Sequence, residues 1–527
     1  MRFIVSTIRQ EPAVYLVPDN WNDWYIWITQ FTAIVVTETG ERTTLGSIKI
    51  GQQGMAPANS RTQLPQEFEE LNASYFSLGQ AENYYETLAE LGDDFRQEYL
   101  RALRDCAFDV TILEQNVGEA VMSQSLLREV QPDRVRRRLN RLAHGDAALS
   151  RYSFEYEFAP TPSALDDAPK LTFNVKPDVL PPTNVHALIG RNGVGKSRCF
   201  DHLTRTLFGL PSEDGGPTGT IRAVLSEVSP FGVAPVEQPL GFAGLVTVAF
   251  SAFDNSRPFR FSDTGEAQLR YAYVGLKKLP QGEVEPTEAS ELVFPLKTHR
   301  ELSREFVESV GKCRLGVRRR RWKRALQILE TDPLFQEADV SSLAEADEDR
   351  WATVAYRRFR KLSSGHGIVL LTITRLVELV EERSLVLLDE PEGHLHPPLL
   401  SAFVRALSDL LTQRNGVAIV ATHSPVVLQE VPKSCVWVLS RTGRSSRVDR
   451  PEMETFGENV GVLTREVFGL EVTQSGFHQM VAEASAELRN YDQVIARFGG
   501  NLGAEGRGLA RTLTLLPPQE TLEPDSE

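Results

Sequence analysis

One stretch of the chain decides the fold: Gly190-Arg191-Asn192-Gly193-Val194-Gly195-Lys196-Ser197, a complete GxxxxGK[ST] motif. An apolar segment at 185–189 precedes it and predicts a strand, and the segment at 197–210 has helical spacing. A glycine-rich turn between a strand and a helix directs backbone N–H groups at phosphate oxygens, and the helix N-terminus adds its positive dipole end. We therefore expect all eight residues to bind nucleotide phosphates. A glycine-rich turn without a ligand is the alternative, which the strand-before and helix-after context disfavours.

The two last residues of the motif carry the chemistry. We expect the Lys196 ammonium to reach the β- and γ-phosphates and the Ser197 hydroxyl to ligate magnesium. The motif thus predicts ATP and Mg²⁺ as cofactors.

A second signal is the segment 384–390, SLVLLDE, which predicts a buried strand ending in two adjacent carboxylates. We expect Asp389 to hold the magnesium ion, directly or through water. We expect Glu390 to act as general base toward the attacking water. A strand ending in two acids is a weak pattern by itself. After a phosphate-binding loop it indicates an ATPase that converts ATP and water into ADP and phosphate.

Two further segments stand at the ends of expected strands or helices. His423 lies in ATHSP, just past the apolar segment 416–420, where it can sense or stabilise the γ-phosphate. Ser363, Ser364 and Gly365 lie in LSSGHG, at the start of a helix that we expect over 363–383, and they form a candidate phosphate cradle. A structural histidine and a plain helix N-cap are the alternatives.

The chain has 527 residues, which suggests two or three domains. We expect an N-terminal α+β domain at 1–150, with strands over 1–50 and helical spacing over 63–130. Alternating strands and helices predict an α/β head with a parallel sheet at 151–440, interrupted by a helical insertion at about 255–361. A helical extension with a disordered acidic tail is expected at 441–527.

Composition limits the function classes. Lys and Arg number 57 against 71 Asp and Glu, a net charge of −14, which argues against a protein that coats nucleic acid. Two compact basic runs stand out, 134–141 and Lys312–Arg324, and the second has eight bases in thirteen residues. It is a candidate nucleic-acid site with Trp322 as a stacking group, and a solvated helix face is the alternative. No apolar run is long enough for a membrane span, and the four scattered cysteines indicate a reducing cytoplasm.

Together, and in this order, these motifs resemble the ABC-type ATPase heads of the SMC/RecF-like group. LSSGHG stands where that superfamily carries LSGGQ, so Ser363 and Gly365 match, while Ser364 replaces a Gly and His366 replaces the Gln. Glu390 matches the catalytic Glu, His423 matches the switch His, and the residues 393–396, GHLH, match the D-loop. DEPEGHLHP followed by ATHSP is similar to the stand-alone bacterial ATPases of the OLD and the Septu or retron-associated types.

The resemblance implies a head with a parallel sheet and flanking helices, an antiparallel β subdomain and a helical lobe. It also implies a homodimer or higher oligomer, in which two heads close on two nucleotides and each phosphate-binding loop faces the partner's signature. For the defence-associated branch it implies a cytoplasmic sensor or regulator of an antiphage system, with an HNH-type nuclease encoded nearby as its effector.

Two departures limit this transfer. No glutamine occurs in 245–261, so the Q-loop role is unassigned, with Ser251 or Asp254 as substitutes, and no Toprim pattern follows His423. A DNA-repair or chromosome-maintenance ATPase of RecF type and a transporter subunit stay open as alternatives. A module that binds ATP without turnover is a third, against which Glu390 and His423 argue.

Overall fold

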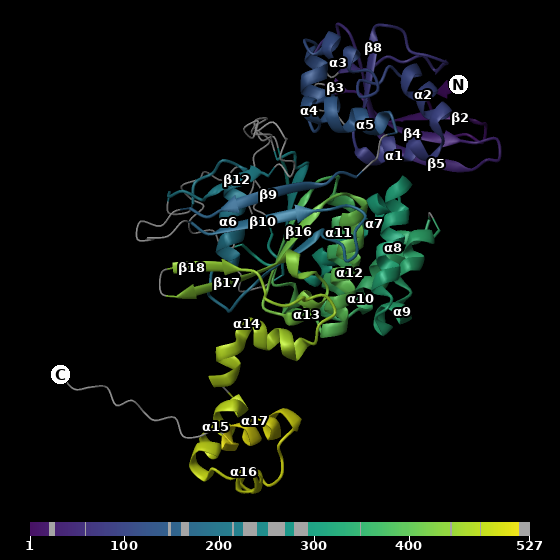
Figure 1. Ribbon diagram of the computed structural model, residues 1–527. Helices are drawn as coiled ribbons and strands as arrows, with labels where there is room; N and C mark the ends of the chain where they lie inside the picture. Colours follow the sequence, from purple (N-terminus) through teal and green to yellow (C-terminus); the bar gives the residue numbers. More distant parts are fainter. Residues whose placement is uncertain are drawn as a thin grey trace.

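The computed structural model describes residues 1–19, 27–57, 60–145, 149–159, 168–212, 215–224, 240–250, 269–278, 294–347, 349–442, 445–474 and 476–515. Figure 1 shows three sections along the chain: an N-terminal section, a central α/β head and a small helical section at the C-terminal end. The acidic tail beyond 515, Ser251 and Asp254 all lie outside the described residues.

The N-terminal section is built on a mostly antiparallel sheet with strand order β7-β1-β2-β4-β5-β8, beside a two-stranded pair β3-β6. Among the described residues, the buried side chains of its hydrophobic core lie between Phe3 and Ala143. Its elements are β1 (Phe3–Ile4), β2 (Ala13–Pro18), β3 (Trp27–Ile28), β4 (Gln30–Val36), β5 (Arg42–Gln52), β6 (Ser60–Arg61), β7 (Glu67–Phe68), β8 (Tyr75–Gly79), α1 (Glu82–Glu90), α2 (Asp93–Ala102), α3 (Val110–Asn116), η1 (Met122–Leu126), α4 (Pro132–Arg134), η2 (Val135–Leu139) and α5 (Asn140–Ala143).

The expectation of helical spacing over 63–130 is wrong at its start, where the structure has β7 and β8. All five residues of β8 are buried, so the strand shows none of the polar alternation that marks a strand with one wet face. Its last residue, Gly79, has no room for a side chain, because a Cβ there would lie 2.3 Å from the Tyr84 ring. The helices begin only at Glu82.

The head is an α/β fold, as expected, around a seven-stranded sheet with order β14-β13-β15-β16-β11-β17-β18. All neighbouring strands are parallel except the last pair, β17 and β18. The strands of the head belong to this central sheet or to a separate antiparallel sheet, β10-β9-β12. They are β9 (Tyr152–Glu157), β10 (Lys170–Val175), β11 (Val185–Ile189), β12 (Thr220–Ala223), β13 (Gly244–Ala249), β14 (Arg270–Gly275), β15 (Leu385–Asp389), β16 (Val417–Thr422), β17 (Val436–Thr442) and β18 (Ser445–Asp449).

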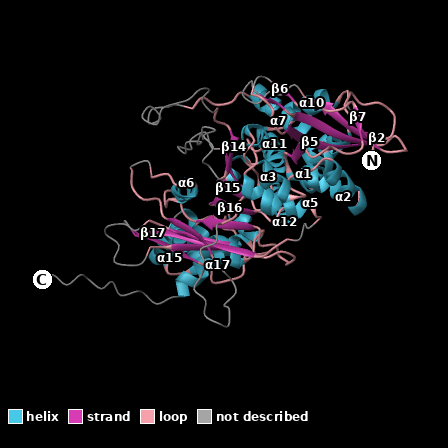
Figure 2. Cartoon of the chain, turned by 90° about the horizontal axis from the view of Figure 1, so that it is seen from above, coloured by secondary structure: helices cyan, strands magenta, loops and turns pink. Residues whose placement is uncertain are grey.

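Both faces of the central sheet are covered, which explains why its strands read as continuous apolar runs. In β15, Val386 and Leu388 join the core on the helical face, while Leu385 and Leu387 join the core on the opposite face. The opposite face is covered by α6 (Lys196–Leu207) and by the antiparallel sheet β10-β9-β12. In Figure 2, strands β14, β15 and β16 lie between α6 on one side and α11 and α12 on the other.

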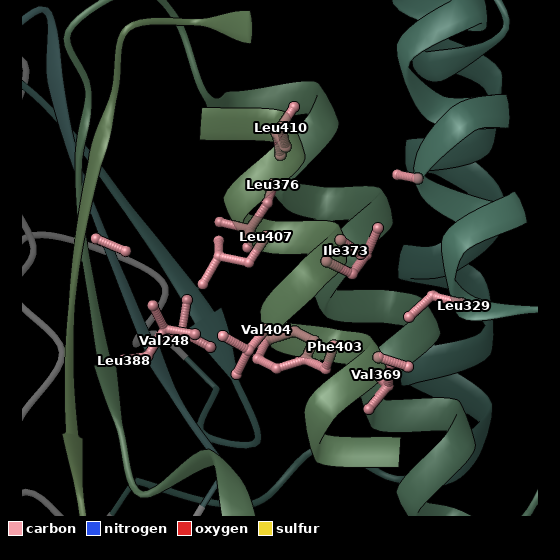
Figure 3. Close-up of a cluster of buried hydrophobic side chains, with 14 of the residues drawn as sticks. Val248, Leu329, Val369, Ile373, Leu376, Leu388, Phe403, Val404, Leu407 and Leu410 are labelled. Carbon is pink, nitrogen blue, oxygen red and sulfur yellow. The ribbon is translucent and has the colours of Figure 1, made fainter. Parts of the chain in front are cut away.

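The helical face carries α11 and α12 and, beyond them, a helical lobe. In the close-up of this core, Val248 and Leu388 of the sheet lie against Val404 of α12 (Figure 3). The helices of the head are α6, α7 (His299–Cys313), α8 (Gly316–Leu329), α9 (Pro333–Ala338), η4 (Val340–Glu345), α10 (Trp351–Lys361), α11 (Ser364–Leu379), η5 (Pro391–His394), α12 (Pro397–Gln413), α13 (Pro425–Gln429) and η6 (Lys433–Cys435).

The C-terminal section consists of α14 (Val460–Gln474), α15 (Gly476–Leu488), α16 (Tyr491–Arg497) and α17 (Ala504–Leu515). The last three share a small core of their own, which includes Val481, Val494 and Ala510. Of the helices in the described part of the chain, none combines the length and the apolar character that crossing a membrane requires.

A buried ionic interface joins the N-terminal section to the head. Glu82 of α1 pairs with Arg414, at the end of α12, and accepts the Glu382 backbone N–H at 3.1 Å. Arg134 and Arg138 reach across in the other direction to Glu381 and Glu382. The basic run at 134–141 therefore supplies interface arginines.

The other basic run, Lys312–Arg324, spans the end of α7 and most of α8. Trp322 is fully buried and donates to the Thr374 hydroxyl at 3.1 Å, so its expected role as a base-stacking group is wrong. Arg321 pairs with Glu86 of the N-terminal section, and Arg324 pairs with Asp409 at 2.6 Å. Much of this charge is thus engaged within the chain.

Candidate active site

The glycine-rich loop links β11 to α6, and its shape depends on three glycines. Gly193 and Gly195 have φ values of +79° and +106°, which favour glycine over any other residue. Gly190 has no room for a side chain, because a Cβ would lie 2.3 Å from the Leu439 carbonyl oxygen on the neighbouring β17. The tight turn leaves Arg191, Asn192 and Gly193 exposed.

Lys196 is the first residue of α6, and its side chain is folded back over the loop. Its Nζ donates to the carbonyl oxygens of Gly190, at 3.0 Å, and Arg191, at 3.1 Å. The side chain is only 3% exposed, so the ammonium is held at a fixed place in the loop. Behind it, burial raises the pKa of the Cys199 thiol to about 12, which leaves that cysteine as packing.

Three neighbouring strands bring the remaining candidates to the same edge. In the parallel register Ile189 lies opposite Thr422, and Asp389 lies opposite Ala421. Since the carboxyl ends of parallel strands meet at one edge, the loop after β11, the acids after β15 and the histidine after β16 become neighbours. β16 lies between the other two strands.

Glu390 occupies the centre of this edge. Its Oε1 lies 3.8 Å from Lys196 Nζ and 3.9 Å from His423 Nδ1. Its backbone has φ +45°, a left-handed conformation that is uncommon for a residue with a side chain, and its N–H donates to the Ala421 carbonyl at 2.9 Å. Such local strain is found at functional sites, where the surrounding structure holds it.

Glu392 is a residue that the motif analysis missed. Its Oε1 accepts from the Thr422 hydroxyl and the His423 backbone N–H, both at 2.6 Å, and lies 3.1 Å from His423 Nδ1. The carboxylate is 7% exposed, while the imidazole that it holds is 44% exposed. The signal was present in the third acid of DEPE, two residues after Glu390.

The expected signature residues lie elsewhere in the head, at the start of α11. Ser363 caps this helix, Ser364 is exposed and Gly365 is buried. The Ser363 hydroxyl bonds to His366 Nδ1 at 2.7 Å. The structure thus gathers Lys196, Glu390 and His423 at one edge, and the signature makes its own local contacts.

The donor set suits magnesium nucleotide. Ser197 offers a hydroxyl in the first turn of α6, and Asp389 offers a carboxylate at the end of β15. Hydroxyl and carboxylate oxygens are the ligands that Mg²⁺ prefers. Backbone N–H groups of the loop, the α6 dipole and Lys196 together suit a polyphosphate.

A comparison with known protein families finds an AAA domain in the head. Residues 328–429 match the family AAA_21, described as "AAA domain, putative AbiEii toxin, Type IV TA system". Over 526 residues, the chain is 37% identical to protein ea59 of Escherichia phage lambda, covering 96% of this chain and 95% of the relative. The chain belongs to the ea59 family.

In this chain, the AAA domain matched by AAA_21 includes α9, α11, β15, α12 and β16. A solved ABC transporter, "An inward-facing conformation of a putative metal-chelate type ABC transporter", is similar at 17% identity and a TM-score of 0.28, over 60% of this chain and 89% of that one.

Proposed function

We propose that this protein binds ATP with Mg²⁺ and hydrolyses it to ADP and phosphate. The observation that carries the proposal is the convergence of Lys196, Glu390 and His423, with Glu390 Oε1 at 3.8 Å and 3.9 Å from the two nitrogens. A cation, a carboxylate base and an imidazole beside a glycine-rich loop form the set that phosphoryl transfer to water needs. The AAA domain match over 328–429 supports the same reaction class.

Each residue has a definite task in this proposal. The loop N–H groups and Lys196 would bind the terminal phosphates, and Ser197 and Asp389 would hold a magnesium ion, which would neutralise phosphate charge. Glu390 takes a proton from the attacking water, and its fixed backbone aims the carboxylate. His423 faces the γ-phosphate, with Glu392 orienting its ring.

We further propose that two copies pair head to head. Ser363 and Ser364 are exposed at the start of α11, and the bonds of Ser363 run to His366 rather than to the glycine-rich loop. The N-terminal end of a 16-residue helix has backbone N–H groups without intrahelical partners and a positive dipole end, which suit a phosphate presented by a second copy. Each site would then be completed by the partner.

The biological role that we propose is a sensor or regulator of phage–host conflict that controls a partner nuclease. The support is the likeness of DEPEGHLHP and ATHSP to defence-associated ATPases and the phage origin of the relative ea59. Nucleotide-driven closure of the two heads would be the signal.

The test is ATP binding and phosphate release by the full chain. Lys196→Ala should abolish ATP binding, because it removes the buried cation of the loop. Glu390→Gln should bind ATP normally and lose about 10²–10⁴-fold in turnover, the range for a general base. Lys170→Ala, which removes a partly exposed lysine from the antiparallel sheet, is the control and should change neither. Wild-type turnover in Glu390→Gln, or unchanged affinity in Lys196→Ala, would refute the site.

A further inference from the structure

Three metal-ligating side chains meet at a second place in the head, distinct from the glycine-rich loop. Asp332, His366 and His396 each offer one ligand atom, and these atoms lie within 4.8 Å of one another. His366 Nε2 is 3.0 Å from Asp332 Oδ1, and His396 Nε2 is 3.5 Å from Asp332 Oδ2. We call these three residues the Asp332 cluster.

The local structure fixes each member at the end of a helix. Asp332 precedes α9, and its Oδ1 accepts the backbone N–H groups of Leu334 and Phe335. His366 lies in the first turn of α11, and His396 is the residue before α12. The side chains of Asp332 and His366 are 2% and 4% exposed, whereas His396 is 51% exposed. Two of the three side chains are therefore buried, and the third is open to solvent.

The surroundings of His366 orient it as a metal ligand would be oriented. Its Nδ1 bonds to the Ser363 hydroxyl at 2.7 Å, which leaves Nε2 to point at Asp332. The Phe335 ring stands edge-on to the imidazole, with centroids 4.9 Å apart. A second ring nitrogen held by a hydrogen-bond partner is the usual support of a metal-binding histidine.

We propose that the Asp332 cluster binds a divalent transition-metal ion of the Zn²⁺ class. Two imidazole nitrogens and one carboxylate are the protein ligands of an open zinc site, and nitrogen donors disfavour Mg²⁺ and Ca²⁺. Tetrahedral Zn²⁺ with bonds of about 2.0–2.1 Å holds neighbouring ligand atoms about 3.3 Å apart. His366 Nε2 lies 3.0 Å from one Asp332 carboxylate oxygen and His396 Nε2 lies 3.5 Å from the other, and one ligand atom from each residue lies within 4.8 Å of the other two, so small side-chain shifts would bring the three to that spacing. Water would fill the open position beside His396.

Binding requires a shift of protons within the two rings. Each Nε2 that now faces Asp332 gives its lone pair to the metal, so each neutral ring carries its proton on Nδ1. In His366, Nδ1–H then donates to the Ser363 hydroxyl oxygen. In His396, Nδ1–H gives up the weak 3.4 Å bond that Nδ1 accepts from the Leu399 N–H. The cost is one weak helix cap.

A metal here would tie three segments of the head together. Asp332 belongs to the helical lobe, His366 to the helix that begins with the signature serines, and His396 to the loop that runs on from Glu390 through η5. The ion would restrain the loop after the catalytic carboxylate against the lobe. The site would therefore regulate the head, beyond the proposed ATP hydrolysis.

The experiment uses the full chain, stripped with a chelator and without nucleotide, so that its result is independent of ATP hydrolysis. Calorimetric titration with Zn²⁺ should show one tight site per chain, and Co²⁺ should give the intense visible absorption of a four-coordinate ion. Asp332→Asn keeps the side-chain oxygen that caps α9, and His396→Ala alters a half-exposed residue, so both should fold. Each should weaken Zn²⁺ binding by at least about 10–100-fold, the loss that supporting residues alone can cause.

Two control variants separate this site from others. His299→Ala removes an exposed lobe histidine, and His423→Ala removes the candidate active-site histidine; both should bind Zn²⁺ like the wild type. Hydrogen exchange of residues 391–399 should slow when Zn²⁺ is added to the wild type and stay unchanged in His396→Ala. The proposal would be overturned if the wild type did not bind Zn²⁺ tightly, or if Asp332→Asn and His396→Ala bound it as tightly as the wild type. Loss of Zn²⁺ binding in His423→Ala would also overturn it.

Discussion

Replacing Glu82 by Gln should loosen the N-terminal section from the head. Glu82 is fully buried and faces Arg414, with Arg134 and Arg138 each at 3.4 Å. The Gln side chain is the shape of a protonated Glu and can still accept the Glu382 N–H, so the variant removes charge and little else. Three arginines would then lose part of their buried countercharge.

The size of the effect follows from the proton affinity of Glu82. Burial alone would raise the pKa of this carboxyl, but the charges of Arg414, Arg138 and Arg134 outweigh burial and lower the pKa from 4.5 to about 2. At about 1.4 kcal/mol per tenfold change in proton affinity, the ionised group contributes about 3 kcal/mol. Because the folded pKa lies below the unfolded one, this stabilisation is present above about pH 4.5 and is lost as the pH falls toward 2.

The assay is thermal unfolding of the full chain, with hydrogen exchange to identify the part that opens first. For a section of this size we expect Glu82→Gln to lower the first transition by about 6–12 °C at neutral pH. Exchange should rise first in α1 and in the segment before β15.

Glu90→Gln is the matched control, since Glu90 is on the same helix and its partner Arg320 is 71% exposed. An exposed pair should cost less than about 1 kcal/mol. Equal shifts in the two variants, or an effect of Glu82→Gln that persists undiminished at pH 2, would contradict a role for the buried charge of Glu82.

Three further outcomes are expected. Ser363→Arg and Lys196→Ala chains, each inactive alone, should regain part of the ATPase rate when they are mixed. A mixture no more active than either variant alone would show that one chain completes its own site. Glu392→Ala should lower turnover about tenfold to a hundredfold with little change in ATP affinity. The reason is that the variant loses charge-assisted hydrogen bonds to His423, which contribute about 1.5–3 kcal/mol. A change in ATP affinity alone would contradict this role. If the exposed side of α8 binds DNA or RNA, replacing Arg319 and Arg320 by Glu should abolish that binding and leave basal turnover within a few-fold; a wild-type chain that retains no nucleic acid at low salt would end this proposal.

Much of the head could be predicted from sequence because its signals are local. The glycine-rich motif specifies its own turn, and the apolar strands at 185–189, 385–389 and 417–422 are bounded by motif residues. Since parallel strands share one edge, the order of the motifs along the chain suffices to expect their side chains at that edge.

Other features depend on contacts that no local pattern records. Trp322 stands among eight bases, yet it is buried because the apolar face of α8 packs against α11 and α12. Asp332 and His366 are 34 residues apart, and only the packing of the lobe brings them together. β8 was missed because burial on both faces removes its alternation.

The ionic interface has a thermodynamic consequence for signalling. The N-terminal section contacts the head through α8, through Glu381 and Glu382 just before β15, and through Arg414 at the end of α12. These contacts share strands and helices with the nucleotide edge, so a change of conformation there alters the free energy of the interface. Linkage is reciprocal: whatever factor nucleotide applies to the equilibrium between docked and undocked N-terminal section, docking applies to the affinity of the head for nucleotide. Measuring the opening of the interface with and without nucleotide would therefore give the coupling in both directions.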